Sequence, residues 1–125
     1  MKNIYYVDGF TIQGNPSRIG GGFTVTDGQG TVIDQQSKRK PGFTNNEAEI
    51  SAVARAAGLA EPRSLIVSDS KIAIAWARSG KSKARPDLNP VCELARTRIR
   101  SKSLILIFRP RAENLAGLVN EARCG

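Results

Sequence analysis

Asn3-Ile4-Tyr5-Tyr6-Val7-Asp8-Gly9 is the stretch that decides the fold, because it predicts a buried strand that ends in an acid. An unbroken apolar run is typical of a strand covered on both faces, in the middle of a sheet. Asp8 then stands where the strand leaves the core, and its charge needs solvent, a basic side chain or a metal ion beside it. The simpler interpretation is that Asp8-Gly9 only marks a turn.

The rest of the chain predicts an α/β fold with one mixed five-stranded sheet and helices on both faces. The expected elements are strands at 20–26 and 31–34 joined by a turn at 27–30, a basic loop at 38–42, a helix opening at 44–49, a strand at 64–69, a helix through Trp76, a basic loop at 78–85, a helix at 88–100, a strand at 103–108 and a helix at 113–122. A strand between two helices should run parallel to its neighbour. We therefore expect three antiparallel and two parallel strands in a single domain over residues 1–125.

Three local patterns refine this expectation. Asn46 with Glu49 three residues later predicts a capping box at the first helix. The helix at 88–100 is expected to turn Leu94 inward, together with Val91, Ala95 and Ile99. The last helix is expected to pack through an apolar face made of Leu115, Leu118, Val119 and Ala122.

Charge and composition restrict the function. The chain has 19 lysines and arginines against 11 acids, a net charge of +8, and no histidine. A basic surface favours polyanions, although a merely basic protein would look the same. The lack of histidine excludes Ser-His-Asp triads, Cys-His pairs and histidine metal ligands. Cys92 and Cys124 match no metal spacing, and no membrane span or signal peptide is evident, so we expect a reduced, cytoplasmic protein without a membrane partner.

Three acids are expected to converge at one edge of the sheet. Asp8 and Asp69 each follow a buried strand, and Glu49 lies in the first turns of the helix between them. Each has a structural explanation: a turn for Asp8, helix capping for Glu49 and the helix dipole for Asp69. Together they form an oxygen-ligand set for hard cations such as Mg²⁺, at the carboxyl ends of parallel strands where sites are common.

The chain resembles ribonuclease H of type 1 over nearly its whole length. The resemblance is carried by Tyr6-Val7-Asp8-Gly9, Gly14-Asn15-Pro16, Thr44-Asn45-Asn46-Glu47-Ala48-Glu49, Ser68-Asp69-Ser70 and Asn114-Leu115-Ala116-Gly117. It implies the fold of that family and cleavage of the RNA strand of RNA/DNA hybrids with two Mg²⁺ ions, with Mn²⁺ as a substitute. It also implies that Asp8, Glu49 and Asp69 bind the metal ions, and no obligatory protein partner is evident.

The resemblance also suggests substrate contacts. Asn15, Asn45 and Lys71 match positions that touch the hybrid, although many members have glutamine where Lys71 stands, and Thr44 matches a position near a DNA phosphate. Helix capping explains the asparagine at 45 equally well. The basic loop with Lys81, Lys83 and Arg85 is a further candidate for phosphate contact, or else a solvated loop.

Two departures from the family leave alternatives open. Gly117 stands where the family usually has a fourth acid, an aspartate, and the family's loop histidine is missing. Glu121, one helical turn further on, could supply the fourth carboxylate, or could be a solvated helix residue. Two rival functions therefore remain beside a hybrid-cleaving ribonuclease: a nuclease of the same fold acting on DNA, and a hybrid-binding module without activity.

Overall fold

The computed structural model describes residues 3–124, and the side chains of residues 3–122 among them. The strands are β1 (Ile4–Thr11), β2 (Gly20–Asp27), β3 (Val32–Arg39), β4 (Leu65–Ser68) and β5 (Ile105–Phe108). The helices are α1 (Asn45–Leu59), α2 (Lys71–Ser79), α3 (Asn89–Ser101) and α4 (Leu115–Cys124), with short 3-10 turns at Pro86–Leu88 and Arg111–Glu113. Among the described residues no helix has the length and apolar character needed to cross a membrane.

The five strands form one mixed sheet in the order β3-β2-β1-β4-β5. β1 pairs antiparallel with β2 and parallel with β4. The outer pairs are β2 with β3, which is antiparallel, and β4 with β5, which is parallel. The predicted fold class is confirmed: the first strand is the centre of the sheet. β1 continues past Asp8 to Thr11 beside β2, whereas its pairing with β4 stops at Tyr6. Beyond that point an open groove lined by Gly9, Phe10 and Thr11 lies beside β1.

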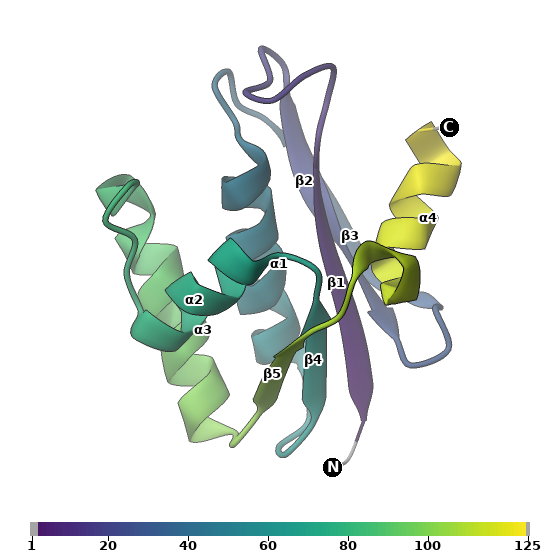
Figure 1. Cartoon of the computed structure of the whole chain (residues 1–125), viewed down its shortest axis with the longest axis vertical. Helices are drawn as coiled ribbons and strands as arrows, with labels where there is room; N and C mark the ends of the chain where they lie inside the picture. The colour runs from purple at the N-terminus through teal and green to yellow at the C-terminus, as the bar shows by residue number, and fades with distance from the viewer. Residues whose placement is uncertain (1–2, 125) are drawn as a thin grey trace.

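Helices cover the sheet on both faces, with α1, α2 and α3 on one side and α4 on the other (Figure 1). Side chains alternate along β1, so Tyr5 and Val7 join the core under α1 whereas Asp8 faces α4. The side of α1 that packs on the sheet is rich in alanine and fully buried at Ala48, Ala52 and Ala56. Small side chains let the helix lie close to the strands.

Four local predictions were wrong. Thr44 caps α1 by accepting the Glu47 amide, whereas Glu49 reaches across to β1 instead of closing a capping box with Asn46. Leu94 is 42% exposed because it lies on the outer side of α3. β3 runs on to Arg39, since an edge strand tolerates charged side chains that face solvent.

The fourth concerns α4, where the expected apolar face is not the buried one. Leu118 is 41% exposed, and the buried residues are Ala116, Gly117 and Asn120. The helix also begins at Leu115, after a 3-10 turn that contains Glu113. α4 therefore presents small and polar side chains to the polar side chains of β1 and β2.

Candidate active site

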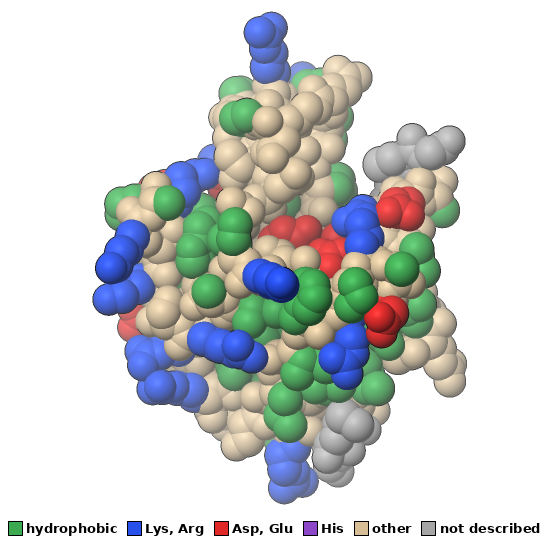
Figure 2. All heavy atoms as spheres, viewed as in Figure 1, with side chains coloured by type: hydrophobic (Ala, Val, Ile, Leu, Met, Phe, Trp, Pro, Cys, Tyr) green, Lys and Arg blue, Asp and Glu red, His purple; other side chains and the backbone are tan. Residues whose placement is uncertain are grey.

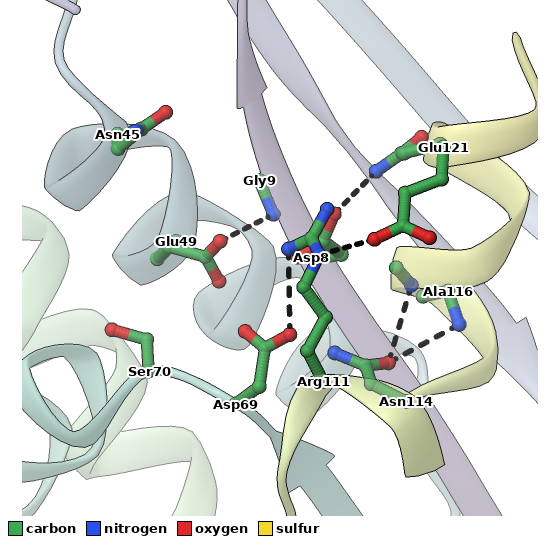
Figure 3. Close-up of polar contacts among 12 residues, drawn as sticks. Asp8, Gly9, Asn45, Glu49, Asp69, Ser70, Arg111, Asn114, Ala116 and Glu121 are labelled. Atoms are coloured by element: carbon green, nitrogen blue, oxygen red, sulfur yellow. Dashed lines mark hydrogen bonds and ion pairs between the residues drawn. The ribbon is translucent and has the colours of Figure 1, made fainter. Parts of the chain in front are cut away.

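Asp8, Glu49 and Asp69 converge as predicted. They come from β1, from α1 and from the residue that follows β4, and one carboxylate oxygen of each lies within 4.8 Å of the others. Asp8 is fully buried and Glu49 is 8% exposed. In Figure 2, acidic side chains lie recessed in the middle of this face, with lysine and arginine side chains around them. Figure 3 shows Glu49 and Asp69 approaching Asp8 from different elements.

Gly9 sets the distance between Glu49 and the strand. A Cβ at this position would lie 2.6 Å from the backbone of Ala48, so a larger residue would push α1 away from β1. The close approach lets the Gly9 amide donate to Oε1 of Glu49 at 3.0 Å. Only a residue without a side chain fits here, and it fixes one oxygen of the acid.

The electrostatics of the three acids favour a bound cation. Burial raises the pKa of Asp8 and raises that of Glu49 well above its ordinary value, with the neighbouring carboxylates adding to both shifts. Oε2 of Glu49 and Oδ2 of Asp69 are buried and accept no hydrogen bond from the residues described. Buried acceptors of this kind usually have a partner. Two free oxygens beside a third acid fit a divalent cation with oxygen ligands.

Two asparagines attach α4 to the strands: Asn120, which the sequence patterns did not single out, and Asn114, which belongs to the resemblance motif and directly precedes the helix. Asn120 donates to Oδ2 of Asp8 at 2.8 Å and accepts from Thr24 of β2 at 2.6 Å. Asn114 is fully buried, donates to the Val7 carbonyl at 2.8 Å and accepts the Ala116 amide at the start of the helix. The three-residue interval between Asn114, Gly117 and Asn120 was the available signal, because it places all three on one side of a helix.

Gly117 lies directly beside the acids, although it has no side chain to offer. A Cβ built on it would lie 3.6 Å from Oδ2 of Asp69. The position where related proteins were expected to carry a fourth acid therefore faces the three acids in this chain as well.

Arg111 is the second component that sequence reasoning missed. Its Nη1 lies 3.4 Å from Oδ1 of Asp8 and 3.6 Å from Oδ2 of Asp69, and its Nε donates to Glu121 at 2.7 Å (Figure 3). Glu121 is half exposed and stands on the far side of this guanidinium from the acids. The hydrogen bond to Glu121 and the nearby acids raise the pKa of Arg111, which therefore stays charged.

The predicted substrate contacts surround an open groove beside the acids. Glu49, Asp69, Asn45 and Lys71 line it, together with the exposed Phe108. The Lys71 ammonium lies 5.0 Å above the Phe108 ring. Asn15 is exposed and accepts the Asn45 amide at 3.0 Å, so the two asparagines that the resemblance selected are neighbours.

Thr44 and Arg85 belong to a separate basic cluster around Glu47. The hydroxyl of Thr44 accepts from Nη1 of Arg85 at 3.2 Å, and Arg85 also contacts Glu47 at 3.4 Å. Glu47 is 3% exposed and pairs with Lys40 and, at 4.0 Å, with Lys38. Lys81 and Lys83 are exposed on the adjacent loop, and within residues 3–124 neither forms an ion pair.

Comparison with known proteins identifies the fold. No family model and no curated protein matches the chain. Among solved structures, the chain is similar to LC11 ribonuclease H1 in complex with an RNA/DNA hybrid, with 24% identity, TM-score 0.63, and coverage of 90% of this chain and 88% of that one. Ribonuclease H1 from Halobacterium salinarum is likewise 24% identical, with TM-score 0.68 and coverage of 98% and 97%.

A third similar structure is the N-terminal ribonuclease H domain of a Mycobacterium tuberculosis protein, 24% identical with TM-score 0.68, covering 93% of this chain and 92% of that one. All three similarities extend over most of both chains. The structure of this chain shows the strand order, the helices on both faces of the sheet and the three converging acids. The comparisons agree with the arrangement of strands and helices. The chain therefore has the ribonuclease H fold.

Proposed function

We propose that this protein is a metal-dependent endoribonuclease that hydrolyses the RNA strand of RNA/DNA hybrids. One observation carries the proposal: three acids, from β1, from α1 and from the residue after β4, meet within 4.8 Å beside an open groove, in a ribonuclease H fold. The complex of the similar LC11 ribonuclease H1 with an RNA/DNA hybrid supports the choice of substrate.

Asp8, Glu49 and Asp69 are the residues that would hold the cations, with Mg²⁺ as the proposed ion, two ions as the proposed number and Mn²⁺ as a substitute. Ions held there would supply the chemistry of phosphodiester hydrolysis, which is activation of the attacking water and stabilisation of the leaving oxygen. The protein's own part is orientation. The Gly9 amide fixes one oxygen of Glu49, and Asn120 fixes one oxygen of Asp8.

The groove supplies the proposed substrate contacts. Asn45 and Lys71 line the groove with the acids, and Asn15 accepts the Asn45 amide. These side chains carry donors and acceptors that ribose hydroxyls need, although Lys71 can only donate. Thr44 and Arg85, which contact each other, and the exposed Lys81 and Lys83 on the loop that carries Arg85 are proposed to contact phosphates.

Glu121 is proposed as the source of the fourth carboxylate. In support, a single guanidinium links its carboxylate to Asp8 and Asp69, so a cation in place of that guanidinium would face all three acids. Comparing Glu121→Gln with Glu113→Gln over a range of Mg²⁺ concentrations tests the role. A ligand requires a raised metal requirement for Glu121→Gln alone, whereas equal and near-native activity of both variants rejects it.

A non-catalytic hybrid-binding module is the second candidate, favoured by the missing side chain at Gly117. A nuclease acting on DNA is the third. A labelled hybrid, duplex RNA and duplex DNA, each incubated with Mg²⁺, Mn²⁺ or chelator, separate the three functions. The proposal expects cleavage of the hybrid alone, and only with metal. Binding without cleavage in either metal would establish the module, and cleavage of duplex DNA would establish the third function.

A further inference from the structure

We infer that Arg111 is an internal counter-cation that occupies the cation site of the three acids and is displaced when a divalent ion binds. The inference rests on the proposed metal site, but it concerns a residue to which that function gives no role. It makes Arg111 a competitor of the metal ion, so that the affinity of the site for divalent cations is set partly by this side chain.

The contacts of Arg111 are of two kinds. Towards the acids they are loose, with Nη1 at 3.4 Å from Asp8 and 3.6 Å from Asp69. Towards Glu121 the contact is a charge-assisted hydrogen bond of 2.7 Å. The side chain is half exposed, so it can swing into solvent without leaving a cavity. Glu121 therefore holds the guanidinium from outside while its other end faces the cluster.

The guanidinium and a metal ion would compete for the negative charge of the same two carboxylates. Mg²⁺ binds oxygen at about 2.0–2.1 Å, and an ion on Oδ1 of Asp8 and Oδ2 of Asp69 would place a dication next to Nη1. Like charges at that separation repel strongly in a partly buried site. Oδ2 of Asp69, which accepts no hydrogen bond, has the Arg111 guanidinium as its near cation. Binding of the metal is therefore expected to weaken both contacts with Arg111 and to favour movement of its side chain into solvent.

Arg111 is also the sole basic partner of these acids in the part of the chain that the structure describes, since every ion pair of Asp8 and Asp69 is with this residue. Arg109, two residues earlier, is exposed as well, but its guanidinium donates only to the Phe108 carbonyl, at 3.1 Å. The two arginines thus carry the same charge in the same segment and differ in contact with the acids. Arg109→Gln is the matched control for Arg111→Gln.

The test is calorimetric titration of metal-free protein with Mn²⁺ at constant ionic strength, on the wild type, Arg111→Gln and Arg109→Gln. Displacement predicts that Arg111→Gln binds Mn²⁺ at least about fivefold more tightly than Arg109→Gln, within the usual range of coupling between two ligands. Thermal melting supplies a second readout. In chelator, Arg111→Gln should melt below Arg109→Gln, and saturating Mn²⁺ should raise its melting temperature by more.

The outcomes separate the inference from the function on which it rests. Equal Mn²⁺ affinity of the two variants, or weaker binding by Arg111→Gln, overturns the inference and leaves a metal-dependent enzyme standing. If none of the three proteins binds Mn²⁺, both the cation site and the inference are wrong. Binding that is detectable only in Arg111→Gln is the strongest support, because it means that the guanidinium holds the site closed to the ion.

Discussion

Glu47 and Glu49 lie two residues apart in α1, both nearly buried, and their surroundings are opposite. Glu47 has three basic partners, Lys38, Lys40 and Arg85. Glu49 has two further acids beside it, and its Oε2 accepts no hydrogen bond from the residues described. Residues two apart point to nearly opposite sides of a helix. About half a turn of helix therefore separates a cluster with surplus positive charge from one with surplus negative charge.

The difference teaches how one short segment can serve two kinds of ligand. β3 with the residue after it and the loop before α3 bring the cations to Glu47, whereas the middle of β1 and the residue after β4 bring the acids to Glu49. A surplus of carboxylates attracts divalent cations, and a surplus of cations attracts phosphates. The predictions below change one side of this contrast at a time.

The largest effect should come from neutralising a member of the acid-rich side. Asp8→Asn and Asp69→Asn should each lower hybrid cleavage by at least about 100-fold, because each removes a metal ligand. Neither should destabilise the metal-free protein, since a repelling charge is removed. Activity assays and melting curves in chelator measure both effects. Asp34→Asn is the control, because Asp34 pairs with Arg55 away from the groove. Near-native activity of either site variant would reject the metal assignment.

Neutralising the two glutamates should change stability in opposite directions. Glu47→Gln should lower the free energy of unfolding by about 1–3 kcal/mol, because it leaves three cations around a neutral side chain. Glu49→Gln should raise it in chelator at about pH 8, where the acids are most ionised, since Gln can still accept the Gly9 amide. Urea denaturation of both variants gives the comparison. If both substitutions changed the free energy of unfolding in the same direction, the opposite charges around Glu47 and Glu49 would not determine stability.

The cation-rich side should govern the salt dependence of hybrid binding. If Lys81 and Lys83 bind phosphates, replacing both with Gln should flatten the slope of log affinity against log salt by about 0.7–0.9 for each phosphate that is no longer neutralised. Replacing the exposed Arg63 and Arg100 with Gln is the control of equal charge. The slopes should be measured in an Asp69→Asn background, which is expected to be inactive, so that the hybrid is not cleaved during the binding measurement. Identical slopes in the two double variants would mean that the loop is merely solvated.

The smallest effect should appear in the pH dependence of the metal-free protein. The pKa of Glu49 in the folded state lies well above its ordinary value of 4.5, and that of Asp8 is raised too. The folded protein thus binds protons more tightly than the unfolded chain, and its stability should fall as pH rises from about 4.5 through the raised pKa. Glu49→Gln should flatten this decline in chelator. If the difference in unfolding free energy between wild type and Glu49→Gln did not change with pH, the raised pKa of Glu49 would be contradicted.

Much of the acid-rich site could be predicted because its residues are local signals. Asp8 and Asp69 follow apolar runs, and the parallel neighbours put the ends of those runs together. The predicted capping box of Asn46 and Glu49 was wrong because Glu49 accepts the Gly9 amide, 40 residues away, and no local pattern reports that contact.

The remaining parts of the site could not be predicted, because they depend on contacts between distant segments. Arg111 meets Asp8 across 103 residues of chain, and Asn120 meets it across 112. No periodicity encodes such a pair. Glu47 was likewise missed, since its three partners come from separate segments that only the folded sheet brings to the helix.

The attachment of α4 has a consequence for motion. This helix is joined to the sheet by Asn114 on the Val7 carbonyl and by Asn120 on Asp8 and Thr24, so polar bonds hold it. A local opening of α4 would free Asp8 from Asn120 and admit water to its carboxylate. A ligand that binds only the closed arrangement lowers the population of the open one. Hydrogen exchange at the α4 amides would then slow when a cation binds Asp8. The exchange rate of the last helix would therefore measure whether the cation site on the first strand is occupied.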